Sequence, residues 1–183
     1  MGPVPRTSSR RRSAGILLYR RSPLPASERG DAGKRLEVLL VHPGGPFFSR
    51  RDAGVWSIPK GEYEDGDDAL QAARREFEEE LGTRAPGDPE PLPLGEVRQK
   101  SGKHVWAWAL EGDLDAANIT SNTFTVEWPP HSGQRREFPE VDRAGWFEID
   151  EAREKLIPAQ VAFLDRLLAQ GGADRVAGEP EGS

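Results

Sequence analysis

The chain has 183 residues, a formal net charge of −6 and no cysteine. This length fits one domain with a buried core, and the charge argues against a main role in holding a nucleic-acid backbone. The lack of cysteine excludes disulfides, thiolate catalysis and cysteine-based zinc sites, and three scattered histidines argue against a histidine-based zinc site. We therefore expect any metal site to use oxygen ligands. We find no apolar stretch long enough for a membrane and no secretory signal, and therefore expect a cytoplasmic protein without a membrane partner or a stable nucleic-acid partner.

We predict one domain over residues 13–170 between two tails. Residues 1–12 are basic and proline-bearing without periodicity, which is typical of a flexible arm. Residues 171–183 are poor in core-forming side chains and predict a flexible tail. The sequence contains no internal repeat and no linker in mid-chain.

Two short aliphatic segments open the domain. Residues 13–21 and 35–43 are rich in leucine, isoleucine and valine and are separated by a polar stretch. This pattern predicts two buried strands.

The next predicted element is a helix over residues 67–81. Its apolar residues recur at helical spacing, at Leu70, Ala73, Phe77 and Leu81. Asp67 or Asp68 can cap its start, and Gly82 suits its end.

The second half of the chain predicts mainly strands. The elements in order are a hairpin of residues 94–100 and 104–112, a half-buried strand at 123–128, a strand at 144–149, and a closing helix over 150–170 broken near Pro158. Strands with a central and a terminal helix indicate an α/β fold.

The predicted central helix carries glutamates where a helix tolerates them least. Glu78, Glu79 and Glu80 fall in its final turn, where the helix dipole repels carboxylates. Glu76 lies one turn earlier on the same face as Glu79 and Glu80, within about 5–6 Å at the Cβ atoms. A divalent cation would neutralise this cluster, and Mg²⁺ prefers oxygen ligands. The pattern therefore predicts a magnesium site.

A solvated acidic surface is the alternative interpretation. Arg75–Glu79 and Arg74–Glu78 pairs could each contribute about 0.2–0.5 kcal/mol. The cations stand on the less favourable side of these pairs, and each last-turn carboxylate costs about 0.3–1 kcal/mol. Several local rules fail together here, which is typical of a functional site.

This region resembles the Nudix box. Residues 61–83 read GEYEDGDDALQAARREFEEELGT, and the family pattern is GX5EX7REUXEEXGU with U a bulky apolar residue. The positions in register are Gly61, Arg75, Glu76, Phe77, Glu79, Glu80 and Gly82. Asp67 replaces the first Glu of the pattern, and Thr83 replaces an aliphatic residue. The resemblance implies an α/β/α sandwich with a mixed β-sheet, a central box helix and a C-terminal helix.

The resemblance also implies a chemistry and a set of metal ligands. Nudix hydrolases use Mg²⁺ or Mn²⁺ and water to cleave a pyrophosphate bond in a nucleoside diphosphate linked to another group. The implied ligands here are Glu76, Glu79 and Glu80 with the backbone carbonyl of Lys60, and Arg75 would orient a glutamate. The box helix would thus supply catalytic groups as well as the metal site.

The general base is open between a box glutamate and a group outside the box. Glu137 and Glu140 are the outside candidates, because they precede a strand that could return to the site; Glu140 is the one we select. Basic residues could contact a phosphate chain, and the candidates are Arg50, Arg51, Lys60, Lys100, Lys103 and His104. Lys60 is preferred, followed by Arg51 and Lys103.

The substrate class follows from finer resemblances. The segment WSIPKGE at 56–62 is more similar to diadenosine polyphosphate and diphosphoinositol hydrolases than to 8-oxo-dGTP hydrolases. Further stretches look like a bacterial group of MutT-like predicted NTP pyrophosphohydrolases. We expect a small phosphorylated partner, an NTP or dinucleoside polyphosphate, with a diphosphoinositol polyphosphate as alternative. A nucleotide sensor without turnover is the rival class, an acidic calcium- or protein-binding module a weaker one, and the oligomeric state is open.

Overall fold

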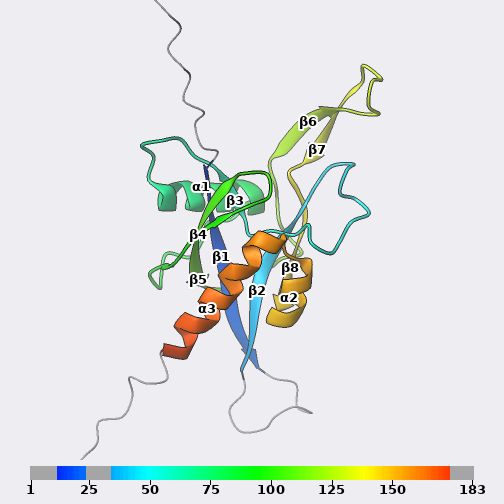
Figure 1. Ribbon diagram of the computed structural model, residues 1–183. Coiled ribbons are helices and arrows are strands. Elements are labelled where there is room, and N and C mark those ends of the chain that lie inside the picture. The colour runs from blue at the N-terminus through cyan, green and yellow to red at the C-terminus, as the bar shows by residue number, and fades with distance from the viewer. Residues whose placement is uncertain (1–11, 24–33, 174–183) are drawn as a thin grey trace, which may run out of the picture.

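The computed structural model describes residues 12–23 and 34–173, and it shows a mixed β-sheet between helices (Figure 1). The strands are β1 (Arg12–Pro23), β2 (Lys34–Pro43), β3 (Lys60–Glu62), β4 (Leu92–Arg98), β5 (His104–Glu111), β6 (Thr123–Glu127), β7 (Arg135–Pro139) and β8 (Val141–Glu148). The helices are α1 (Ala69–Leu81), α2 (Ile149–Lys155), the short 3-10 helix η2 (Pro158–Gln160) and α3 (Val161–Ala173). The predicted α/β/α sandwich is confirmed.

Strand β1 is the centre of the six-stranded sheet, whose order is β4-β5-β1-β2-β8 with β3 paired to β1. One edge of β1 runs parallel to β5, while the other edge is shared by β3 near its start and β2 near its end. Ile16 and Leu18 face α1, whereas Leu17 and Tyr19 face the layer of α2 and α3. Burial on both faces explains why this segment reads as a continuous apolar run.

The helix α1 begins and ends as its sequence predicts. Asp68 is its N-cap, because its Oδ1 accepts a hydrogen bond from Gln71 N at 3.0 Å. Gly82 is its C-cap in the left-handed conformation, with φ 73°, and its N–H donates to Glu78 O. The buried residues are Ala72, Ala73, Phe77 and Leu81. Ala72 therefore takes the core position expected for Leu70, which is only partly buried.

The structured region extends slightly beyond the predicted domain. Strand β1 starts at Arg12 and α3 ends at Ala173, so both predicted tails lose residues to regular elements. The rest of the predicted arm and tail, residues 1–11 and 174–183, lies outside the described residues. Within the described ranges, no helix is both long and apolar enough to cross a bilayer.

The predicted strand at 123–128 exists, but it does not join the main sheet. It forms β6, which pairs with β7 in a separate two-stranded ribbon that projects from the sandwich (Figure 1). The loop after β2 supports this ribbon, since Phe47 and Trp128 make an edge-to-face contact at 5.4 Å. Strand β7 is not predicted by the sequence, because its polar and exposed residues carry no burial pattern.

The closing segment matches the expectation of a broken helix. Strand β8 begins earlier than predicted, at Val141, and pairs with β2. Helix α2 ends before Pro158, where η2 redirects the chain into α3. Buried side chains of both helices, including Ala152 and Phe163, pack on the sheet face opposite α1.

Gly82→Ala should destabilise the protein by at least about 1–2 kcal/mol, because an alanine disfavours the left-handed conformation. A Cβ at this position would also lie 2.8 Å from Thr120 O. The free energy of unfolding from urea titration measures the effect. Gly87→Ala is the matched control, because a Cβ there would meet nothing within 4 Å. An equal loss in both variants would contradict the assigned role of Gly82.

Candidate active site

The glutamates of α1 lie against the short strand β3. A Cβ on Gly61 would be 1.8 Å from Glu76 Oε2, so the carboxylate of Glu76 occupies the space that only a glycine leaves open. The backbone N–H of Lys60 donates to Glu80 Oε2 at 3.3 Å. The first contact explains why a glycine stands at position 61 of the box.

The site concentrates negative charge away from water. Burial raises the pKa of Glu80 to about 7, against the opposing effect of Lys60, and the charges of Glu140 and Glu76 add to the increase. Burial, followed by the charge of Glu79, also raises the pKa of Glu76. Burial disfavours the negatively charged form of both carboxyl groups, and a bound cation would stabilise that form.

Arg75 lies beside two of the box glutamates. Its Nη2 is 3.3 Å from Glu76 Oε1, and its Nε is 3.9 Å from Glu79 Oε1. The second contact is the pair that the acidic-surface interpretation expects. Arg75 is half exposed, with 52% of its side-chain surface accessible, so it offsets only part of the buried charge.

The other pair expected on an acidic surface, Arg74–Glu78, does not form. Arg74 Nη1 donates to Pro86 O at 2.9 Å, and Glu78 lies 3.5 Å from Arg84 Nε. Glu78 therefore points away from the face that carries the three box glutamates. This separation makes Glu78 a natural control for them.

Backbone hydrogen bonds bring Glu140 to the end of α1. Asn122 N donates to Glu79 O at 3.0 Å, and Glu140 N donates to Asn122 O at 2.8 Å. Gly44 N in turn donates to Glu140 O at 2.9 Å. The carboxylate of Glu140 is close enough to raise the pKa of Glu80. The structure thus adds a fourth carboxylate from a distant part of the chain.

Glu137, the other candidate base, is not part of this cluster. It lies on β7 in the projecting ribbon, where it accepts a hydrogen bond from Thr123 Oγ1. Glu137 and Glu140 are both exposed, so their contacts, and not burial, separate them. Of the two acidic residues considered before β8, the structure brings only Glu140 to the box helix.

Two of the three selected cations lie at the site. Lys60 is half-buried, and burial lowers its pKa while the charge of Glu80 opposes this and that of Lys103 reinforces it. Lys103 Nζ is 2.9 Å from Glu62 Oε1 on β3. Lys60 and Lys103 therefore form a positive group next to the carboxylates.

Arg51 is placed differently. It is exposed in the loop after β2, with its guanidinium 5.8 Å from the centre of the Phe48 ring. Within the described part of the chain, no hydrogen bond or ion pair joins its side chain to the box glutamates. Arg50 and Lys100 are also exposed, and His104 is bonded to Glu96.

The two departures from the box pattern lie outside the carboxylate cluster. Asp67 Oδ2 accepts a hydrogen bond from Glu64 N at 3.2 Å, and its own N–H donates to Glu64 O at 3.2 Å. Asp67 thus closes the turn that leads into α1. Thr83 is exposed just after the C-cap.

The donor set fits a hard divalent cation, although its members are not gathered around one point. Over residues 12–23 and 34–173, no three acidic or histidine side chains are close enough to form a complete metal site. The available donors are carboxylates and backbone carbonyls, which are the ligands preferred by Mg²⁺ and Mn²⁺. Their uncompensated charge, centred on Glu76 and Glu80, fits a cation.

A cavity of about 520 Å³ lies elsewhere on the α1 face of the sheet. Its lining includes Arg20, Asp113 and Trp146. Arg20 is already bonded to Asp113 at 2.8 Å and stacks 4.2 Å above the Trp146 ring. Because this cation is neutralised and no box residue lines the cavity, we place the candidate site at the carboxylate cluster.

Ser121→Ala should loosen the segment that holds Glu140, because Ser121 Oγ accepts a hydrogen bond from Val141 N at 3.0 Å. Loss of one such bond corresponds to about tenfold faster amide exchange, measurable at Val141 and Glu140 by hydrogen exchange. Ser132→Ala is the control, since Ser132 Oγ accepts only at the ribbon tip, from Gln134 N. Unchanged exchange at both amides would disprove that the Ser121 hydrogen bond holds the segment of Glu140.

Comparisons with known proteins support the same family. The family model described as NUDIX domain matches residues 9–167. The 8-oxo-(d)GTP phosphatase of Mycolicibacterium smegmatis is 30% identical over 154 residues, which is 79% of this chain and 37% of that protein. The chain therefore spans little more than a third of this relative's length.

Solved structures share the fold. An Ap4A hydrolase binary complex from C. elegans has a TM-score of 0.54 and 21% identity, covering 89% of this chain and 98% of that chain. The NUDIX domain of Shewanella oneidensis NrtR, solved with ADP ribose, has a TM-score of 0.58 and 14% identity, covering 92% and 93%. Together with the box residues and the sandwich fold, the family match shows that the chain belongs to the Nudix family.

Proposed function

We propose that this protein hydrolyses a pyrophosphate bond in a nucleoside diphosphate-linked substrate, with Mg²⁺ or Mn²⁺. The observation that carries the proposal is the buried negative charge where Glu76 and Glu80 meet β3. The cation would be held by these two residues, Glu79 and the Lys60 carbonyl. When bound, it supplies polarisation of phosphoryl oxygens and acidification of water.

The remaining roles follow from the positions of the side chains. Glu140 accepts the proton of the attacking water, because it is the acidic group fixed beside the box helix from outside it. Arg75 holds Glu76 and Glu79 in place by its ion pairs. This division suits phosphoryl-type transfer, in which positioning and charge stabilisation supply most of the catalysis.

A nucleotide with a polyphosphate chain is the substrate class we propose, either an NTP or a dinucleoside polyphosphate. Lys60 and Lys103 lie together near the carboxylates and can balance phosphate charge. The names of two similar proteins, an Ap4A hydrolase and an 8-oxo-(d)GTP phosphatase, fit this class. Arg51 contributes less, because its described side-chain contact is with Phe48 and not with the box glutamates. A cytoplasmic location remains a prediction from the sequence.

Nucleotide binding without turnover is the second candidate. It is favoured by the open arrangement of the carboxylates, which do not form a complete metal site, and by the ADP ribose bound to the NUDIX domain of NrtR. The retention of Glu76, Glu79 and Glu80 favours hydrolysis over this candidate.

Glu79→Gln and Glu80→Gln should each lower metal-dependent turnover at least about 100-fold, because each removes one negative charge from the proposed cation site. The measurement is release of phosphate or nucleotide from NTPs, dinucleoside polyphosphates, ADP-ribose and diphosphoinositols with Mg²⁺ or Mn²⁺. Glu78→Gln is the control, because Glu78 lies in the same turn but pairs with Arg84. Tight binding with no turnover on any substrate would select the second candidate.

Glu140→Gln should lower kcat about 100-fold or more with little change in KM, because a general base contributes to the reaction and not to substrate binding. Glu137→Gln should leave both constants unchanged, since its carboxylate is committed to the ribbon. Steady-state kinetics over a range of pH measures both. Equal effects of the two substitutions would remove Glu140 from the mechanism and assign the base to the box.

A further inference from the structure

Ser13 is a buried polar residue without a hydrogen-bond partner. Its side chain is 0% exposed, and its Oγ bonds to no atom of the described residues. Ser13 alternates with Ala14 along β1, so it points to the sheet face opposite α1, the same face as Leu17. An unpaired buried hydroxyl is costly and calls for an explanation.

The strand register places charged side chains beside this hydroxyl. Ser13 pairs with Glu62 and Gly15 pairs with Lys60 across β1 and β3. Directly paired residues share a face, and diagonal neighbours remain within reach of long side chains. Lys60 and Glu62 therefore lie on the Ser13 side of β3, while Gly61 and the carboxylate of Glu76 lie on the other.

The turn between β4 and β5 adds two more groups to this face. Val105 pairs with Ser13, so Lys103, two residues earlier, extends over the same side. Lys103 Nζ reaches Glu62 Oε1 at 2.9 Å across the start of β1. Gln99 lies opposite Lys103, because Gln99 N donates to Lys103 O at 2.9 Å, and the buried Nε2 of Gln99 has no partner among the residues that the structure describes.

These side chains, the Ser13 cluster of Ser13, Lys60, Gln99 and Lys103, offer more hydrogen-bond donors than the structure uses. Ammonium and amide nitrogens only donate, and a hydroxyl can donate as well. The acidic groups near the cluster are Glu62, which pairs with Lys103, and Glu80, whose charge acts on Lys60. An anion whose oxygens only accept hydrogen bonds is the complementary ligand, and phosphate is the strongest such group.

We infer that the Ser13 cluster binds a phosphate group of the substrate, one beyond the bond that is cleaved. The inference rests on the proposed function. The three-residue strand β3 is the divider, since Lys60 N contacts Glu80 on one side while its side chain joins the cluster on the other. A polyphosphate chain that passes the edge of β3 meets the carboxylates and the cluster in turn. Substrates with three or more phosphates are therefore preferred.

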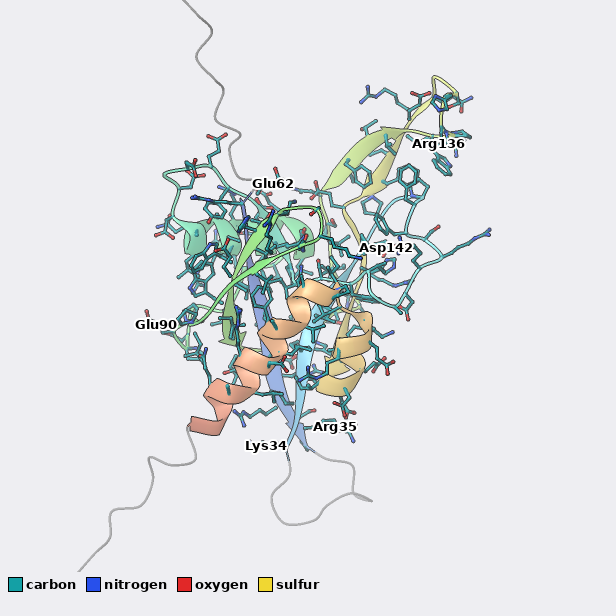
Figure 2. All side chains as sticks on the ribbon, in the orientation of Figure 1. Lys34, Arg35, Glu62, Glu90, Arg136 and Asp142 are labelled. Atoms are coloured by element: carbon teal, nitrogen blue, oxygen red, sulfur yellow. The ribbon has the colours of Figure 1, made fainter. Side chains whose placement is uncertain are left out.

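Binding of inorganic tripolyphosphate to the full chain in EDTA tests this inference by calorimetry. Ser13→Ala, Gln99→Leu and Lys103→Met should each weaken binding about tenfold, as expected for a lost hydrogen bond to a charged group. Lys34→Met is the matched control, because Lys34 lies at the opposite end of the sheet from Glu62 (Figure 2). Its tripolyphosphate affinity should equal that of the native chain.

Ser13→Ala also separates binding from folding. Removing an unpaired buried hydroxyl should leave the melting temperature unchanged or raise it, so a loss of affinity in this variant cannot come from unfolding. Native-like affinity in all three cluster variants, or equal binding of malonate, would overturn the phosphate assignment. Metal-free binding that depends on the cluster, together with no hydrolysis of any nucleotide, would uphold phosphate binding by the Ser13 cluster and reject the proposed function.

Discussion

The candidate site depends on carboxylates that are buried by contacts between α1 and β3. Glu76 rests on Gly61, and Glu80 accepts from the backbone of Lys60. Burial and neighbouring carboxylates raise the pKa of both groups, although the bond from the Lys60 backbone by itself lowers the pKa of Glu80. A fold optimised only for stability would disperse these charges, so their concentration supports the proposed cation site.

The hydrogen bonds that end α1 also assemble the site. The last carbonyl groups of a helix lack partners within it, and here Glu79 O and Leu81 O accept from Asn122 N and Thr120 N. The segment that satisfies them then receives Glu140 N. Helix termination and placement of the proposed base therefore use one backbone network, and Gly82 allows the close passage of Thr120 that this network requires.

Strand β3 divides two chemically different faces. On the α1 side the available groups are acceptors, the carboxylates of Glu76 and Glu80. On the other side they are chiefly donors, among them Lys60 and Ser13. A polyphosphate ligand with bound cations carries both signs of charge, and it can match this arrangement better than a simple anion or a lone metal ion.

The sequence by itself determined the features set by local spacing. The caps of α1 at Asp68 and Gly82, the apolar run of β1 and the box glutamates are all readable, because helix period, capping chemistry and burial leave marks on neighbouring residues. The choice of oxygen ligands followed from the lack of cysteine and from histidines that are few and scattered.

Only the tertiary structure decided which distant segments meet. Strand register and backbone bonds across long loops decide three features. They are the preference for Glu140 over Glu137, the absence of a described contact between Arg51 and the box glutamates, and the placement of Ser13 and Lys103 on one face of the sheet. The exposed residues of β7 gave no warning that they form a ribbon with β6. Spacing along the chain cannot encode such contacts, because they result from how separate segments satisfy one another's hydrogen bonds after the core has formed.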